Sequence, residues 1–151
     1  MNKKNNKEYC LYDEYNLKGK HKIKFKFISS NRFREQFIVL DLYSFKGDIF
    51  YQGKRYIKPK RKFPTLDLDE EFYGKEFVLE INLIEGNIRI FNGAAKIFGL
   101  KTMISYATND FNMQIEQLSD TKKRYYCDDY EKNFCYNDLI FEIEILDWLN
   151  N

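Results

Sequence analysis

The 151-residue chain is poor in the residues on which most catalytic and metal sites depend. It contains one histidine, three cysteines and seven glycines. Nucleophilic catalysis needs a base such as histidine beside the nucleophile, and zinc sites need several Cys and His side chains. The glycines match neither fingerprint of a phosphate-binding loop. We therefore expect no enzymatic activity and no organic cofactor, and we expect His21, between Lys20 and Lys22, to lie in an exposed turn.

Long apolar runs are also missing. No segment approaches the roughly 20 apolar residues that a membrane-spanning helix needs, and the sequence opens with a polar, lysine-rich stretch. As written, this predicts a cytoplasmic protein; if a signal peptide was removed, it predicts a secreted one. Residues 1–9 are predicted to form a flexible tail, and residues 10–151 a single domain.

Alternating apolar residues are abundant, and residues 76–91 are the clearest case. Two alternating runs meet at Gly86-Asn87, which suits a two-residue hairpin turn. In that hairpin one face is wholly apolar and belongs to the core, because successive side chains of a strand point to opposite faces. The other face is mixed, and we select four of its residues as candidate ligand contacts: Glu80, Asn82, Arg89 and Phe91.

Further strands are indicated along most of the chain. Residues 20–28 alternate, with an outward lysine strip (Lys22, Lys24 and Lys26), and residues 35–43 are apolar enough to be covered on both faces. Residues 92–95 suggest a turn, and alternation returns in residues 111–118 and from Leu139 onward. Eight or nine short strands predict an all-β, antiparallel β-sandwich of jelly-roll-like form, with a closed β-barrel as the alternative.

Charge is distributed unevenly along the sequence. Residues 1–62 contain 17 of the 25 lysines and arginines, whereas residues 63–151 contain 17 of the 23 acidic residues. Six of the ten residues from Lys54 to Phe63 are basic, and Pro59 excludes a central strand there. This basic arm (residues 54–62) supplies further candidate ligand contacts: Lys54, Arg55, Tyr56 and Lys58. The alternative is that basic and acidic strands are neighbours in the sheets and neutralise one another.

One cluster is rich in oxygen ligands: it begins directly after Cys127 and extends past Cys135 to Asp138. Hard cations such as calcium take six to eight oxygen ligands from flexible loops. Calcium is therefore the one ion for which we name candidate ligands, and these are Asp128, Asp129, Asn137 and Asp138. A disulfide between the two cysteines is an option for an exported protein, whereas in the cytoplasm both would be thiols.

The segment Asn133-Phe134-Cys135-Tyr136-Asn137-Asp138-Leu139-Ile140-Phe141-Glu142-Ile143 resembles the closing strand of secreted, jelly-roll-like β-sandwich domains. In those domains an aromatic-Asn-Asp-aliphatic-aliphatic-Phe pattern precedes a final alternating strand, often near calcium. The segment departs from the pattern at Cys135, where an acidic residue is usual. The resemblance implies a sandwich with Asn137 and Asp138 as calcium ligands.

These observations predict a non-catalytic binding or accessory module. Its many tyrosines and its predicted sheet faces suit a carbohydrate or another protein as ligand, because planar aromatic side chains on a sheet pack against sugar rings. The alternative is an anionic polymer such as nucleic acid, bound through the basic N-terminal half, since aromatic residues among basic ones suit single strands.

Overall fold

The computed structural model describes residues 7–30, 35–98, 101–105, 112–128 and 138–147. These residues form strands and one short helix. No helix among them is long and apolar enough to cross a membrane. The elements are β1 (Lys7–Cys10), β2 (Asp13–Tyr15), β3 (Gly19–Ser30), β4 (Glu35–Asp41), β5 (Lys46–Tyr51), β6 (Lys54–Tyr56), β7 (Thr65–Asp69), α1 (Glu70–Tyr73), β8 (Glu76–Glu85), β9 (Ile88–Phe98), β10 (Lys101–Ser105), β11 (Asn112–Gln117), β12 (Lys122–Asp128) and β13 (Leu139–Ile145).

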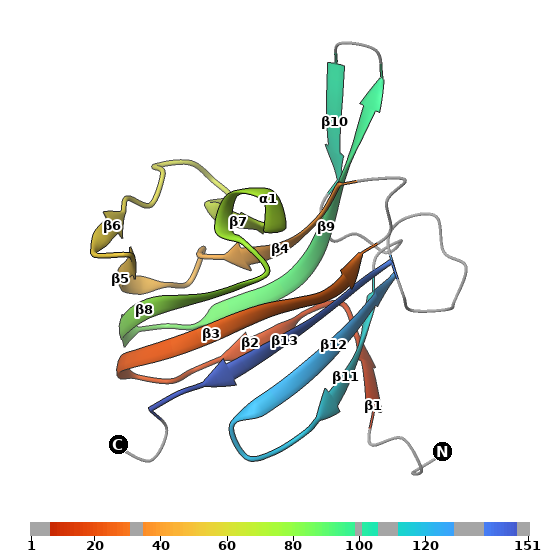
Figure 1. Ribbon diagram of the computed structural model, residues 1–151. Coiled ribbons are helices and arrows are strands. Elements are labelled where there is room, and N and C mark those ends of the chain that lie inside the picture. The colour runs from red at the N-terminus through yellow and green to blue at the C-terminus, as the bar shows by residue number, and fades with distance from the viewer. Residues whose placement is uncertain (1–6, 31–34, 99–100, 106–111, 129–137, 148–151) are drawn as a thin grey trace.

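The strands are arranged in two antiparallel sheets (Figure 1). The larger sheet has eight strands in the order β1-β11-β12-β13-β3-β8-β5-β6. The smaller sheet has five strands, β10-β9-β4-β7 with β2 paired to β9. The prediction of an all-β sandwich is therefore confirmed. The described strands do not close into the barrel that was the alternative.

The core lies between the two sheets and follows the period of two. On β3 every second residue from Ile23 to Phe27 is buried, while the lysines between them face outward. On β4 consecutive residues are buried, as predicted for a strand covered on both faces. Aromatic stacking reinforces the packing: the ring centroids of Phe25 and Phe77 are 5.2 Å apart. Each fully buried large apolar side chain contributes about 1.5–3 kcal/mol, so these alternating residues provide most of the stabilisation.

The predicted hairpin of residues 76–91 is wrong in its pairing and right in its core face. β8 pairs with β3 and β5 in the larger sheet, whereas β9 pairs with β4, β2 and β10 in the smaller one. Gly86-Asn87 therefore connects the two sheets, and Asn87 N donates to the Ser44 carbonyl at 3.3 Å. Two strands that face each other across a core bury the same alternate residues as two hairpin partners. The predicted core residues are indeed buried: Phe77, Leu79, Ile81, Leu83, Ile88 and Ile90.

The predicted turn at residues 92–95 is also wrong, because β9 continues through it. Its small residues have a packing role instead. A Cβ on Gly93 would lie 2.5 Å from the Phe37 ring and 3.0 Å from a Val39 methyl group. Gly93 thus provides space for side chains of the neighbouring strand β4.

A partly buried polar network joins the two sheets. Tyr125 of β12 donates to Asp13 Oδ2 of β2 at 2.7 Å, and its hydroxyl lies 2.5 Å from that of Tyr15. Lys123 Nζ lies 3.0 Å from Asp13 Oδ2. Burial raises the pKa of Tyr125 well above its ordinary value, so the hydroxyl keeps its proton and remains a donor. The network connects the edge strand β2 of the smaller sheet to the larger sheet.

Candidate functional site

The outer face of the larger sheet carries a regular array of side chains on β3, β8 and β5. Leu79, Ile81 and Leu83 of β8 point into the core, so the alternate residues of that strand point outward. Directly opposed residues of antiparallel strands lie on the same face, about 4.5–5.5 Å apart. The register therefore gives two outward rows, which run from β3 through β8 to β5 as Lys20–Asn82–Asp48 and Lys22–Glu80–Phe50.

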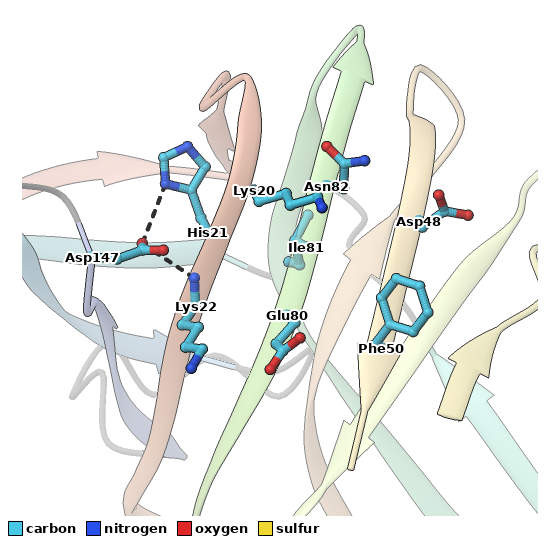
Figure 2. A pocket seen from close by; sticks show the side chains of 9 residues that line it. All are labelled: Lys20, His21, Lys22, Asp48, Phe50, Glu80, Ile81, Asn82 and Asp147. Atoms are coloured by element: carbon cyan, nitrogen blue, oxygen red, sulfur yellow. Dashed lines mark hydrogen bonds and ion pairs between the residues drawn. The ribbon is translucent and has the colours of Figure 1, made fainter. Parts of the chain in front are cut away.

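These two rows border a pocket of about 390 Å³. Its size falls within the range of about 300–1,000 Å³ that is typical of small-molecule sites. Figure 2 shows Asn82 and Asp48 near one end, and Glu80 and Phe50 toward the other. The lining residues are Lys20, His21, Lys22, Asp48, Phe50, Glu80, Ile81, Asn82 and Asp147.

His21 positions Asp147 at one edge of this pocket. The side chain is 4% exposed, its Nε2 lies 2.9 Å from the Lys18 carbonyl oxygen and its Nδ1 lies 3.4 Å from Asp147 Oδ1. The same Asp147 oxygen accepts from the main-chain N–H of Lys22 at 3.2 Å. The predicted exposed turn is therefore wrong, because His21 belongs to the inward-facing residues of β3. Its contacts hold Asp147, which follows β13, at the edge of the pocket (Figure 2).

Charges of both signs alternate across this face. Lys22 is directly opposite Glu80 in the register. Lys24 Nζ lies 3.2 Å from carboxylate oxygens of both Glu76 and Glu144, and these hydrogen bonds raise the pKa of Lys24. The arrangement supports the interpretation in which neighbouring strands neutralise one another. It weakens the lysine strip as an anion-binding surface.

The same pattern continues onto β13. Glu142 is 4% exposed and accepts from Arg124 at 2.7 Å, and Lys122 Nζ lies 3.3 Å from its other oxygen. Burial by itself would raise the pKa of Glu142, but hydrogen bonds from Arg124 and Lys122 outweigh it and lower the pKa. This buried carboxylate is therefore a structural charge, stabilised by cations of the adjacent strand.

The four candidate contacts on the mixed face are divided between the two sheets. Glu80 and Asn82 line the pocket. Arg89 and Phe91 lie on β9 in the smaller sheet, where the Arg89 guanidinium is 4.7 Å from the centroid of the Tyr12 ring. The predicted single face is thus wrong for a physical reason, since β8 and β9 are not partners. Ligand binding by these residues stays a prediction.

The basic arm begins as an edge strand, as Pro59 implied. β6 is the last strand of the larger sheet, and both Lys54 and Arg55 are exposed. Lys58 Nζ donates at 2.8 Å to a main-chain carbonyl of the loop between β4 and β5, and the Tyr56 hydroxyl donates to a carbonyl of β7. Arg55 Nη1 lies 3.6 Å from Asp48 Oδ1. Lys58 and Tyr56 therefore support the local structure, whereas Lys54 and Arg55 extend from it.

Two of the four predicted calcium ligands, Asp128 and Asp138, lie within the residues that the structure describes. Asp128 and Asp138 are buried, and Asp138 N donates to the Cys127 carbonyl at 3.0 Å. Asp129 and Asn137 lie outside the described residues. Within the described ranges, no group of three or more His, Cys, Asp or Glu side chains is placed to hold a metal ion. Calcium binding stays a prediction.

Cys127 is a buried free thiol. Burial raises the pKa of this thiol well above its ordinary value, so it is unreactive in the folded chain. The disulfide that an exported protein would form here is not present on Cys127, and Cys135 lies outside the described residues.

Sequence reasoning missed part of the pocket, namely Asp48, Phe50 and Asp147. Alternation along β5 places Asp48 and Phe50 on one face, with buried Ile49 on the other. The missing information was the pairing of β5 with β8, which brings these residues beside Glu80 and Asn82. Asp147 follows the last strand and is held by His21, and no local pattern indicates that contact.

With this geometry established, the chain was compared with protein families, curated proteins and solved structures. None of the three comparisons found a match.

Proposed function

We propose that the protein is a non-catalytic binding module that holds a carbohydrate in the pocket between β3, β8 and β5. The observation that carries the proposal is the combination of one half-buried aromatic ring, Phe50, with donors and acceptors of both charge signs around it. A pyranose ring has an apolar C–H face and a rim of hydroxyl groups. The ring of Phe50 suits the first, and Asn82, Asp48 and Glu80 suit the second.

The charge balance of the pocket also supports a neutral, polar ligand. Its lining includes two lysines, Lys20 and Lys22, and three carboxylates, those of Asp48, Glu80 and Asp147. A polyanion would meet the carboxylates, and a polycation would meet the lysines. Sugar hydroxyl groups both donate and accept, so they pair with either type of side chain.

The arrangement of His21 supports binding rather than reaction. It is the single histidine of the chain, and both of its ring nitrogens face oxygen acceptors. It positions Asp147 and does not extend toward the open part of the pocket. This supports a module that holds its ligand without transforming it.

The test is a glycan-binding screen with the intact protein, followed by calorimetry on Phe50→Ala. We expect the substitution to weaken saccharide binding about tenfold, which corresponds to about 1.4 kcal/mol and is within the range of an aromatic contact. Phe63→Ala is the matched control, since Phe63 is 67% exposed and lies outside the pocket lining. A flat response of the folded protein across mono- and oligosaccharides would refute the proposal.

Two finer predictions accompany this function and remain to be tested. The resemblance of residues 133–143 to secreted domains supports a jelly-roll-like form and an extracellular location, and the alternative location is the cytoplasm. Fractionation of cells that express the natural gene would distinguish the two compartments.

A second candidate function is binding of a single-stranded nucleic acid by the basic arm. The observation in its favour is that exposed apolar side chains accompany the basic residues: Ile57 is 75% exposed and Lys62 Nζ lies 5.3 Å from the centroid of the Phe63 ring. Aromatic and basic residues together suit stacked bases and phosphates. Such binding must weaken steeply with salt, whereas carbohydrate binding in the pocket depends little on it.

A further inference from the structure

We propose that the ligand is an oligosaccharide that extends across two adjoining chambers of the sheet face, with Phe50 at the boundary. This inference rests on the proposed carbohydrate-binding function and specifies its ligand class. It predicts that a single sugar unit occupies only part of the site.

The second chamber adjoins the first along β8. It has a volume of about 370 Å³, similar to the 390 Å³ of the first, and both are lined by Phe50 and Glu80. These two residues are directly opposite each other on β5 and β8. Of the outward residues of β8, Asn82 lines the first chamber and Val78 lines the second. The cross-strand pair of Phe50 and Glu80 is therefore the boundary between them.

The spacing along β8 favours a ligand longer than one ring. Asn82 and Val78 are four residues apart, which corresponds to about 13 Å along a strand. A single pyranose ring is shorter than this distance, whereas a linear oligosaccharide reaches both positions. The ring of Phe50, at the centre, would contact the sugar unit that joins the two chambers.

The chemistry of the second chamber fits the same ligand class. Aromatic residues Tyr51 and Tyr73 line it together with Gln52 and the carboxylates of Glu76 and Glu80. Its lining includes no basic side chain, so it disfavours a polyanion. Tyr51 and Tyr73 pack against the buried ring of Phe77, with ring centroids 6.3 and 4.7 Å from it, so they form the apolar floor of this chamber. The half-buried ring of Phe50 is the aromatic face suited to a sugar, and Gln52 and the two carboxylates suit its hydroxyl groups.

The test is calorimetry with matched saccharide series: glucose, cellobiose and cellotetraose, with the corresponding maltose and xylose series in parallel. In at least one series we expect the tetrasaccharide to bind the unmodified protein about tenfold more tightly than the monosaccharide, equivalent to about 1.4 kcal/mol. Val78→Arg fills the second chamber, and we expect the tetrasaccharide to bind this variant no more tightly than the monosaccharide does. Ile84→Arg is the control, because Ile84 is an outward, 66% exposed residue of the same strand that lines neither chamber.

The outcomes separate this inference from the function on which it rests. If a monosaccharide binds and its tetrasaccharide binds no more tightly, the two-chamber site is overturned while carbohydrate binding stands. The same conclusion follows if Val78→Arg, with its fold confirmed by circular dichroism, retains the full gain with length. If no saccharide of any series binds the folded protein, both proposals fail.

Discussion

Replacement of Gly86 by alanine tests the connection between the two sheets. Gly86 has φ +88°, and a Cβ on it would overlap the main-chain carbonyl oxygen of Ser44 and lie 2.7 Å from its carbonyl carbon. The next residue, Asn87, donates its N–H to the same oxygen. The alanine therefore meets both a backbone conformation unsuited to it and rigid main-chain atoms of the loop between β4 and β5.

The magnitude can be estimated from three effects. A positive φ costs a non-glycine residue about 1–2 kcal/mol. Displacing the packed Ser44 main chain costs about 1–3 kcal/mol more, as overpacking does elsewhere. Loss of the hydrogen bond from Asn87 adds about 1 kcal/mol. We expect Gly86→Ala to lower the free energy of unfolding by about 4 kcal/mol, a large part of the 5–15 kcal/mol that is typical of a domain.

The control is Gly19→Ala, which isolates the effect of the close contact. Gly19 has φ +90°, and a Cβ on it would have nothing within 4 Å. It should therefore cost only the conformational part, about 1–2 kcal/mol. Urea denaturation followed by circular dichroism gives both values, and the melting temperature should fall by about 8–16 °C for Gly86→Ala. Equal costs for the two variants would refute the placement of Gly86 against Ser44 and favour the free hairpin turn.

Two further predictions concern polar interactions of the larger sheet. Tyr125→Phe removes the buried donor to Asp13 and should lower the free energy of unfolding by about 1–3 kcal/mol. Tyr126→Phe, on the half-exposed outer side, should lower it by less in the same denaturation assay. Equal losses of stability for the two variants would contradict the inter-sheet network. Because hydrogen bonds from Arg124 and Lys122 lower the pKa of Glu142, the stabilisation from this carboxylate is fully present above the ordinary glutamate pKa of about 4.3. It is lost as the pH falls through the lowered folded-state value. The stability difference between the natural protein and Glu142→Gln should therefore shrink on acidification below about pH 4, and a difference that is constant from pH 7 to pH 2 would contradict the assignment.

Alternation along each strand predicted the fold class and much of the core. It succeeds because burial depends only on which face a side chain occupies, and the period of two determines that directly. Ile23, Phe25 and Phe27 are buried as expected, and so are the apolar residues on both sides of Gly86. The period of two does not determine which strands pair with one another. The apolar faces of β8 and β9 meet across the core as well as they would meet beside each other, so the pattern does not distinguish a hairpin from a connection between sheets.

Strand pairing, which the alternating pattern does not determine, also explains why the site was predicted only in part. Glu80 and Asn82 were selected because they face outward from a regular strand, and this holds wherever the strand is placed. Arg89 was selected on the assumption that β9 pairs with β8, whereas β9 pairs with β4, β2 and β10. Asp48 and Asp147 enter the pocket through long-range pairing with β8 and through His21, and neither relation leaves a local pattern in the sequence.

The outward residues of β8 and β5 indicate why this face, rather than the basic arm, is the better candidate site. The fold is stabilised by the inward residues, and an outward aromatic ring contributes little to it. Phe50 nevertheless occupies the centre of the face, beside Glu80 and between two chambers of similar size. In the basic arm, by contrast, Lys58 and Tyr56 are engaged with main-chain carbonyls, so folding accounts for them. Substitutions at the outward positions should therefore change affinity with little change in stability, and substitutions at the inward positions should do the reverse.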